Sequence, residues 1–432
     1  MGKFIPALEL KSKEEISHFQ SGELRKLLSY LKTRSPFYQR LFENHGINLE
    51  EMKGMEDLLR IPPTTKDDLQ NFQWDFLCVP KSEIKEYTST SGTLGKPVTI
   101  GLTAKDVERL AYNEYISFAC AGGTATDLYQ LMLTLDRQFM AGIAYYEGIR
   151  KLGAGIVRVG PGLPAMQWET IERLKPTVLV GVPTFLVKLI EYAKQQGASL
   201  SSSSVRAAVC IGENIRTPDF ELNAVGKKIV SEWNIQLFST YASTEMQTAF
   251  TECEHGMGGH HHPELLIVEI LNENNEPVPN GQPGEVTITT LGVEGMPLLR
   301  YKTGDIAVAH TTSCKCGRNT LRLSPLLGRK QQMIKLKGTS IYPAGVFEIL
   351  QQQPSVIDFV VEAYTGVLET DELRIHIHTQ ESQADAEKRI RNAFQSRIRI
   401  IPEIVFVSLA ELENLQMGKG ERKVRRFVDA RQ

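Results

Sequence analysis

Residues 175–243 alternate short apolar runs with amphipathic segments, and this alternation limits the folds that the chain can adopt. The pattern predicts, in order, a strand and a helix within 175–197, a strand at 205–212, a helix at 217–233 and a strand at 235–243. Strands that alternate with helices form a parallel sheet covered on both faces. Ligands of such sheets bind beyond the carboxyl ends of the strands. We therefore expect an α/β domain whose site residues follow its strands.

The chain has 432 residues, which is too long for one ordinary core. After residue 328 the pattern changes to a short helix, a strand hairpin, a longer helix and a last strand at 403–409. We predict a large multi-sheet α/β domain over 1–328 and a small α+β domain over 329–432.

Composition excludes several function classes. The formal net charge is −2, so neither a nucleic acid nor a membrane surface is expected as a partner. No apolar run reaches the roughly 18 residues of a spanning helix, and residues 1–14 lack the pattern of a secretory signal. Six cysteines are too few for a disulfide framework in a chain of this length, so we expect a reducing cytoplasm. The sequence leaves open whether the protein is a monomer or a homodimer.

The segment "TSTSGTLGKP" joins two stretches that alternate like strands. It is not a Walker loop, because its glycines are too close together and a proline follows the lysine. Hydroxyls, glycine amides and one ammonium group suit phosphate oxygens, although a plain polar hairpin turn is the alternative. The candidate phosphate-binding residues are Thr88, Ser89, Thr90, Ser91, Gly92, Thr93, Gly95 and Lys96.

This loop resembles the phosphate loop of the adenylate-forming superfamily, which includes acyl-CoA ligases. The motifs "SPFYQRLFENHGI", "IPPTTKDDL", "KPTVLVGVPTFLVKL" and "MPLLRYKTGDI" resemble the phenylacetate–CoA ligase branch, and they occur in the family's order from about residue 24 onward. The resemblance implies that a carboxylate and ATP give acyl-AMP and pyrophosphate, after which CoA gives acyl-CoA and AMP. It also implies Mg²⁺ and a C-terminal domain that moves between the two half-reactions.

The resemblance gives a role to "STYASTE", residues 239–245. Tyr241 would stack on adenine, Thr244 would contact phosphate, and Glu245 would bind Mg²⁺ through a carboxylate oxygen. Ala242 and Ser243 complete this nucleotide-binding segment, with Ala242 where the family often has glycine. A helix N-cap at Ser243 or Thr244 is the structural alternative.

Three further segments resemble nucleotide-binding motifs of the family. Gly212 and Glu213 would line the adenine site, although such a pair is often only a turn. Asp305 would accept hydrogen bonds from the ribose hydroxyls. Arg329, in the segment that resembles the family's hinge, would reach the ribose or the α-phosphate, while Gln331 stands where the family commonly has an acidic residue.

The resemblance also places catalytic and CoA-binding groups in the C-terminal domain. Lys423 fits best the lysine that bridges carboxylate and α-phosphate, and Lys419 is its competitor. A solvated basic tail is the alternative for both. Lys335, Lys337 and Gly338 would contact CoA.

The region 136–155 would hold the acyl group. Its aromatic residues Phe139, Tyr145 and Tyr146 allow an aryl acid such as phenylacetate without requiring one.

Cysteines and histidines in "ECEHGMGGHHHPE" and "SCKCGRN" favour a closed tetrahedral Zn²⁺ site within 253–316. The expected ligands are Cys253, Cys314, Cys316 and His260, and His260 is preferred because it matches a histidine in related chains. His255 is the rival, while His261 and His262 are weaker candidates. Four protein ligands would make this zinc structural. Reduced surface cysteines beside a histidine-rich loop are the alternative.

We therefore expect an AMP-forming acid–thiol ligase that uses ATP, Mg²⁺, CoA and a structural Zn²⁺, with a small carboxylic acid as substrate. Two alternatives remain: an adenylating enzyme that passes the acyl group to a carrier protein or an amine, and a non-catalytic nucleotide- or acyl-binding protein.

Overall fold

A computed structural model describes residues 4–52, 54–90, 97–336, 339–366, 370–398, 400–417 and 425–431. The chain divides into two compact units. Unit 1 comprises Met1–Thr303 and Ala307–Leu326, and unit 2 comprises Gly304–Ile306 and Leu327–Gln432. Asp305 and Ile306 belong with unit 2 because they pair with Arg329 and Gly328 on a neighbouring strand.

Parallel strands form half of the main sheet of unit 1. Their order is β7-β6-β5-β3-β4, and their bounds are β3 (Leu128–Leu131), β4 (Gly155–Arg158), β5 (Val178–Gly181), β6 (Ala207–Cys210) and β7 (Gln236–Ser243). Alternate residues of β5 enter different cores: Leu179 joins one apolar cluster, while Val178 and Val180 join another. Both faces of the sheet are therefore covered, as the apolar runs predict.

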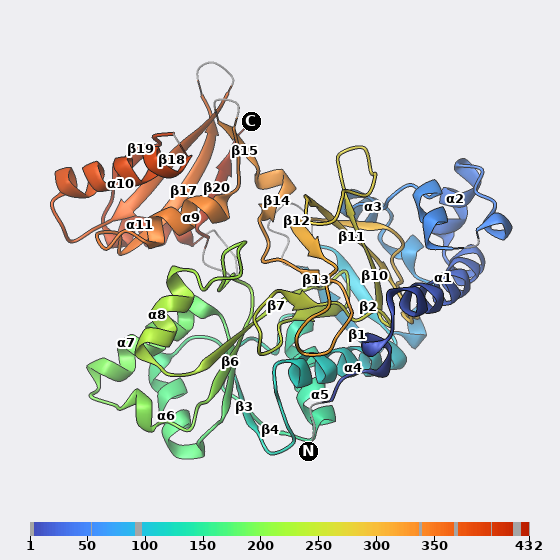
Figure 1. Ribbon diagram of the computed structural model, residues 1–432, viewed down its shortest axis with the longest axis horizontal. Coiled ribbons are helices and arrows are strands. Elements are labelled where there is room, and N and C mark those ends of the chain that lie inside the picture. Colours follow the sequence, from blue (N-terminus) through green and yellow to red (C-terminus); the bar gives the residue numbers. More distant parts are fainter. Residues whose placement is uncertain are drawn as a thin grey trace. The chain divides into compact units, whose positions relative to one another are not determined.

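Helices form both covering layers. They are α4 (Ala104–Cys120), α5 (Met140–Leu152), α6 (Pro164–Leu174), α7 (Pro183–Gln195) and α8 (Ala224–Glu232). Figure 1 shows α6, α7 and α8 beside β6, and their apolar residues share a cluster with β5 and β6. The helix predicted over 217–233 is wrong in its first seven residues, since α8 begins at Ala224. The Asn223 side chain caps α8 by accepting from Gly226 N, and Arg216 bridges to Leu222 before it.

The other half of the main sheet is largely antiparallel. Its strands are β8 (Thr248–Thr251), β9 (Gly259–His260), β10 (Leu266–Leu271), β11 (Pro283–Thr290), β12 (Tyr301–His310) and β13 (Arg322–Leu323). A separate hairpin joins β1 (Glu86–Ser89) to β2 (Thr99–Leu102).

The N-terminal part of unit 1 is helical. Its α-helices are α1 (Lys13–Arg34), α2 (Pro36–Asn44) and α3 (Lys66–Phe72), and its short 3₁₀ helices are η1 (Ala7–Leu10), η2 (Leu49–Glu51), η3 (Met55–Arg60), η4 (Gln73–Phe76) and η5 (Lys81–Glu83). A further 3₁₀ turn, η6 (Leu200–Ser202), follows α7. The Ser35 side chain accepts from Tyr38 N and so starts α2 directly after α1 ends.

Unit 2 is a four-stranded sheet with helices, in the order β19-β18-β17-β20, plus two short pairs. The elements are β14 (Gly328–Arg329), η7 (Lys330–Gln332), β15 (Ile334–Leu336), β16 (Thr339–Ile341), α9 (Pro343–Gln351), β17 (Asp358–Thr365), β18 (Asp371–His378), α10 (Gln383–Ile398), β19 (Glu403–Phe406), α11 (Leu409–Gln416) and β20 (Phe427–Ala430). The prediction of 403–409 as the last strand is wrong, because β20 pairs in parallel with β17 after it.

The predicted fold class is confirmed: a large multi-sheet α/β unit is joined to a smaller α+β unit. Among the helices that the structure describes, none is both long enough and apolar enough to span a bilayer.

Candidate active site and metal cluster

The described part of the predicted phosphate loop is a hairpin whose hydroxyls contact its own backbone. Thr88 Oγ1 donates to Ile100 O at 3.4 Å, and Val98 N donates to Thr90 Oγ1 at 3.0 Å. Ser89 is buried, and its N–H donates to Gln138 O at 2.9 Å. The remaining predicted loop residues, Ser91, Gly92, Thr93, Gly95 and Lys96, lie outside the described residues.

Tyr241 lies near the end of β7, and Glu245 lies on the turn between β7 and β8. The ring of Tyr241 stacks on Phe250 with centroids 5.8 Å apart. Glu245 Oε1 accepts from the Tyr301 hydroxyl at 3.4 Å. The Ser243 hydroxyl accepts from Met246 N at 3.2 Å, but no helix follows, so the N-cap alternative is wrong. Ala242 is exposed on β7, and Thr244 is half-buried on the turn that follows.

Glu213, directly after β6, caps a helix. Its carboxylate accepts from Thr184 N at 3.1 Å and from Thr184 Oγ1 at 2.9 Å, at the start of α7. Gly212 before it has φ +75°, a left-handed conformation that favours glycine. The exposed Gly212–Glu213 turn therefore has a structural function of its own at the carboxyl end of a parallel strand.

In unit 2, the structure brings Asp305 and Arg329 together. They are directly opposed on antiparallel strands β12 and β14, with Arg329 Nε 3.4 Å from Asp305 Oδ1. Asp305 is nearly buried, whereas the Arg329 side chain is half-exposed. The backbone that follows Arg329 is held by the guanidinium group of Arg431. This group donates to Gln331 O at 2.8 Å and to Met333 O at 2.7 Å.

Of the predicted acyl-pocket residues, Phe139 directly precedes α5, and Tyr145 and Tyr146 lie in the middle of this helix. Tyr145 is buried in a core cluster and meets Phe118 edge to face at 5.7 Å. Burial raises the pKa of its hydroxyl. Phe139 packs at the margin of the same cluster, and Tyr146 lies under the guanidinium groups of Arg150 and Arg158.

Of the predicted CoA contacts, Lys335 lies on β15 and is exposed. Its backbone N–H donates to Asp371 Oδ2 at 2.7 Å. The other predicted C-terminal residues, Lys337, Gly338, Lys419 and Lys423, lie outside the described residues.

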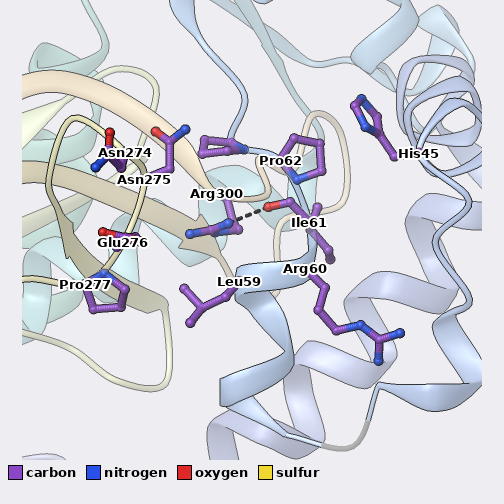
Figure 2. A pocket seen from close by; sticks show the side chains of 11 residues that line it. His45, Leu59, Arg60, Ile61, Pro62, Asn274, Asn275, Glu276, Pro277 and Arg300 are labelled. Carbon is purple, nitrogen blue, oxygen red and sulfur yellow. Dashed lines mark hydrogen bonds between the residues drawn. The ribbon is translucent and has the colours of Figure 1, made fainter.

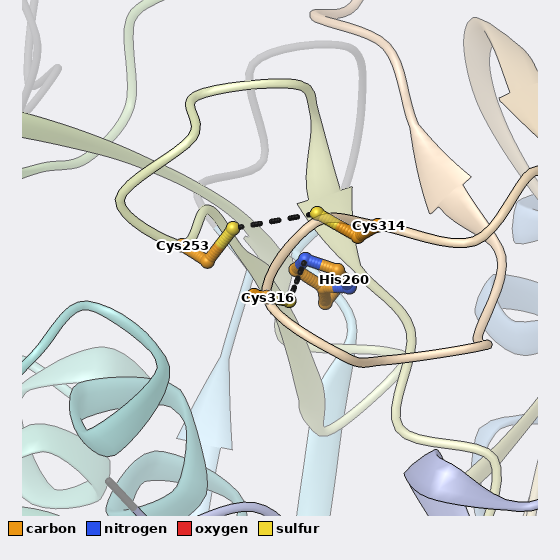
Figure 3. Close-up of side chains that lie close together, drawn as sticks. All are labelled: Cys253, His260, Cys314 and Cys316. Carbon is orange, nitrogen blue, oxygen red and sulfur yellow. Dashed lines mark hydrogen bonds between the residues drawn. The ribbon is translucent and has the colours of Figure 1, made fainter.

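The four predicted metal ligands converge, as Figure 3 shows. One ligand atom from each of Cys253, His260, Cys314 and Cys316 lies within 4.8 Å of all the others. Cys253 Sγ is 3.7 Å from Cys314 Sγ, and Cys316 Sγ is 3.5 Å from His260 Nε2. Ligands at zinc's bond lengths around a tetrahedral ion stand roughly 3.3–3.8 Å apart, so these separations fit Zn²⁺.

The rival histidines lie outside this cluster. His255 is partly exposed, with its Nε2 3.9 Å from Glu254. His261 Nε2 is 2.5 Å from Leu266 O, and His262 Nδ1 is 2.5 Å from Glu9 Oε1. Strand pairing explains why His260 and not another histidine joins the cysteines, because on β9 it pairs with Thr251 on one side and with Arg322 on the other.

A buried ionic network surrounds the cluster. Arg318 Nη1 donates to Cys316 Sγ at 3.5 Å, and Arg318 Nε donates to Glu9 Oε2 at 2.5 Å. His262 Nε2 lies 3.3 Å from Ser117 Oγ on α4. Glu9, His262 and Arg318 are all fully buried. The hydrogen bond with Cys253 is the main cause that lowers the pKa of Cys316, and His260 and Arg318 lower it further, which suits a thiolate ligand.

A cavity of about 420 Å³ lies elsewhere in unit 1, lined among others by His45, Leu59, Arg60 and Glu276 (Figure 2). Arg300 in its wall donates to Ile61 O and pairs with Glu269 at 2.8 Å. None of the predicted site residues lines this cavity, so we assign it no role in catalysis.

Comparison with known proteins identifies the family. Residues 87–295 match the family model of AMP-binding enzymes. The phenylacetate–coenzyme A ligase of Thermus thermophilus is 30% identical over 451 aligned positions, which cover 99% of each chain. The chain belongs to the phenylacetate–CoA ligase branch of the adenylate-forming enzymes. It is an ATP-dependent, AMP-forming acid–thiol ligase.

Other comparisons agree with this family. The phenylacetate–coenzyme A ligase of Escherichia coli K12 is 25% identical, with 99% of this chain and 98% of the relative covered. A crystal structure of 2-hydroxyisobutyryl-CoA ligase in the postadenylation state has a TM-score of 0.85 at 22% identity, covering 99% of this chain and 94% of that one. At 22% identity, the similarity to the 2-hydroxyisobutyryl-CoA ligase structure supports the fold alone.

Sequence reasoning missed several residues that organise the ligase. Arg109 on α4 is buried and holds the turn after Glu245, but an arginine in an amphipathic helix looks like a surface residue. Glu9 is more than 250 residues from its partners, and nothing local distinguishes it from other acidic residues of the N-terminal segment. Gln247, two residues after Glu245, stands in a stretch rich in serine, threonine and glutamate, so nothing local distinguishes it.

Proposed function

We propose that this ligase activates a small, largely apolar acid with an aryl group, such as phenylacetate, and transfers it to the thiol of CoA. The observation that carries the proposal is the end-to-end similarity to the Thermus enzyme of that name. The aromatic residues of α5 support an aryl acid, because Phe139 and Tyr146 lie at the edge of an apolar cluster.

In the nucleotide site, we assign adenine stacking to Tyr241, whose ring is supported by Phe250. Thr244 would contact a phosphate, and Glu245 would hold Mg²⁺. When bound, Mg²⁺ neutralises charge on the phosphate oxygens. The Tyr301 hydroxyl orients the Glu245 carboxylate through their hydrogen bond.

The ribose contacts belong to unit 2. Asp305 accepts from the hydroxyls, and Arg329 opposite it fixes the carboxylate and reaches the sugar or the α-phosphate. The hydroxyl-rich loop would contact the outer phosphates, and Gly212 and Glu213 the adenine edge. Lys423 would bridge the carboxylate and α-phosphate, and Lys335, Lys337 and Gly338 would contact CoA.

We further propose a structural Zn²⁺ at Cys253, His260, Cys314 and Cys316. Three soft sulfur ligands and one imidazole suit zinc, and four protein ligands leave no position for a substrate. None of the six cysteines, all within the described residues, is in a disulfide bond, which supports a reducing compartment such as the cytoplasm.

The decisive experiment is a panel of carboxylic acids assayed for AMP formation with and without CoA. We expect acid-dependent AMP whose turnover requires CoA, with phenylacetate or a related aryl acid among the best substrates. Turnover without CoA but with an added amine or carrier protein would assign a different acceptor. ATP binding without pyrophosphate release for any acid would overturn the proposal.

A further inference from the structure

The side-chain carboxamide of Gln247 is buried and makes no hydrogen bond with any residue that the structure describes. The residue is 1% exposed, and neither its Nε2 nor its Oε1 has a partner. A primary amide offers two N–H donors and one oxygen acceptor. Because leaving such groups unpaired inside a protein costs free energy, most buried polar atoms are satisfied, and an exception calls for a cause.

The backbone of the same residue is held firmly. Gln247 has φ +51°, a left-handed conformation that is unfavourable for a residue with a side chain. Its N–H donates to Ser243 O at 3.3 Å, and its C=O accepts from Arg109 Nη1 at 2.8 Å. Arg109 also donates to Leu265 O at 2.6 Å and to Leu291 O at 2.7 Å. A strained backbone conformation that is held in place by several surrounding contacts is typical of functional sites.

The polar residues of α4 run along β8 beside this turn. Arg109 donates to Thr248 Oγ1 at 3.3 Å, and four residues later Asn113 Oδ1 accepts from Ala249 N at 3.2 Å. Asn113 Nδ2 donates to Glu114 Oε1 at 3.0 Å. The side chains of Arg109, Asn113 and Glu114 in this row are hydrogen-bonded, unlike the Gln247 amide. Burial raises the pKa of Glu114 to about 8, so that its carboxyl is largely uncharged at neutral pH.

This row runs from the turn that carries Glu245 to the face of α4 that packs on α5, the helix that carries Tyr145 and Tyr146. Gln247 follows Glu245 by two residues on the turn between β7 and β8. On its other side α4 packs tightly on α5, where a Cβ added to Gly148 would come within 2.2 Å of Glu114 Cβ. An acid with only apolar groups would leave the Gln247 amide unpaired, whereas a substrate with a polar substituent would satisfy it.

We propose that Gln247 is a specificity-determining residue whose carboxamide hydrogen-bonds a hydroxyl or amino substituent on the acyl part of the acid. This inference rests on the proposed function and narrows its substrate class from plain aryl acids to hydroxylated or aminated ones. A buried group that is built to hydrogen-bond a substituent discriminates strongly against the analogue that lacks it, whereas an apolar pocket discriminates weakly.

The test compares wild type with Gln247→Met, which keeps the volume and removes the hydrogen-bonding atoms. Phenylacetate is paired with mandelate, 3-hydroxyphenylacetate, 4-hydroxyphenylacetate and 4-aminophenylacetate, and kcat/KM is measured as AMP formation. We expect at least one substituted acid to exceed phenylacetate about tenfold or more in wild type, and this ratio to fall about tenfold in the variant. The exposed Gln196→Met on the loop after α7 should leave the ratio unchanged.

Two results would overturn the inference. One is a ratio that is the same in wild type and Gln247→Met, which would leave the ligase function intact. The other is a lower melting temperature for ligand-free Gln247→Met, because removing an unpaired buried amide should leave stability equal or higher. If no acid yields AMP, the proposed function fails instead, and calorimetric binding of the same acid pairs to both proteins still decides the role of Gln247: an unchanged preference, or no binding of any acid, counts against it.

Discussion

The metal cluster and the nucleotide site differ in how completely the fold of the polypeptide assembles them. The cluster draws four ligands from β9 and two loops and holds them within bonding reach of one ion. In the proposed nucleotide site, by contrast, Thr88 and Glu213 hydrogen-bond to neighbouring parts of the chain.

The difference reflects what each site must do. A resident ion becomes part of the folded structure, so its ligands gain from being fixed and from having buried partners such as Arg318. ATP, acid and CoA must enter and leave in every turnover, so residues that contact them need other partners while they are away. The predictions below test this contrast, beginning with the substrate site.

The largest effect is expected for Lys423→Ala. A point charge between carboxylate and α-phosphate acts only in the adenylation half-reaction, so acyl-AMP formation should fall by at least about 10²-fold. Thioester synthesis from supplied acyl-AMP should persist, measured by acyl-CoA formation in single turnovers. Lys419→Ala is the matched control. If Lys419→Ala shows the selective loss instead, the two lysines have been assigned in the wrong order.

The next effect concerns the cluster. Cys316→Ser should lose bound zinc, measured by metal analysis, and unfold at lower temperature. A ligand that binds only the folded state stabilises it by about 4 kcal/mol when its free concentration is 1,000 times Kd. His255→Ala should retain one zinc per chain. Full zinc content in Cys316→Ser, or loss of zinc in His255→Ala, would contradict the ligand set.

The smallest effect is a pH dependence set by Glu114. Burial raises its pKa from 4.5 to about 8, so over this interval the folded protein retains a proton that the unfolded chain releases. Stability therefore falls as pH rises through that window, by an amount on the order of 1–3 kcal/mol.

Glu114→Gln should remove this slope while keeping the acceptor for Asn113, as measured by urea unfolding at pH 5 and pH 8. Glu108→Gln, at an exposed position of the same helix, should keep the wild-type slope. Parallel pH profiles for wild type and Glu114→Gln would show that the carboxyl is ionised within the fold.

Patterns within a short stretch of sequence predicted the fold class, and they named the four cysteine and histidine side chains that converge in the structure. The apolar runs around Leu179 and Val209 defined parallel strands, because a strand buried on both faces needs few polar residues. The four predicted metal ligands could be recognised in the sequence because cysteine and histidine are rare in this chain. Their convergence depends on strand pairing at His260, which the sequence only suggested.

Interactions between residues that are far apart in the sequence could not be predicted from local patterns. α8 begins later than the sequence pattern predicts, because the Asn223 side chain caps the helix there. Arg109 and Gln247 meet through the packing of α4 on β8, and no local pattern encodes that contact. The roles assigned to Asp305, Arg329 and Lys423 stay predictions, since they concern partners that arrive only with substrate.

The buried carboxylate of Glu9 has a consequence for protein synthesis. Its partners His262 and Arg318 are 253 and 309 residues further along the chain, so the ribosome produces the acid long before either partner exists. Until residue 318 emerges, the first helical turn can form but has no counter-charge to lie against. The N-terminal segment must therefore be among the last pieces of unit 1 to settle, although it is among the first to be translated.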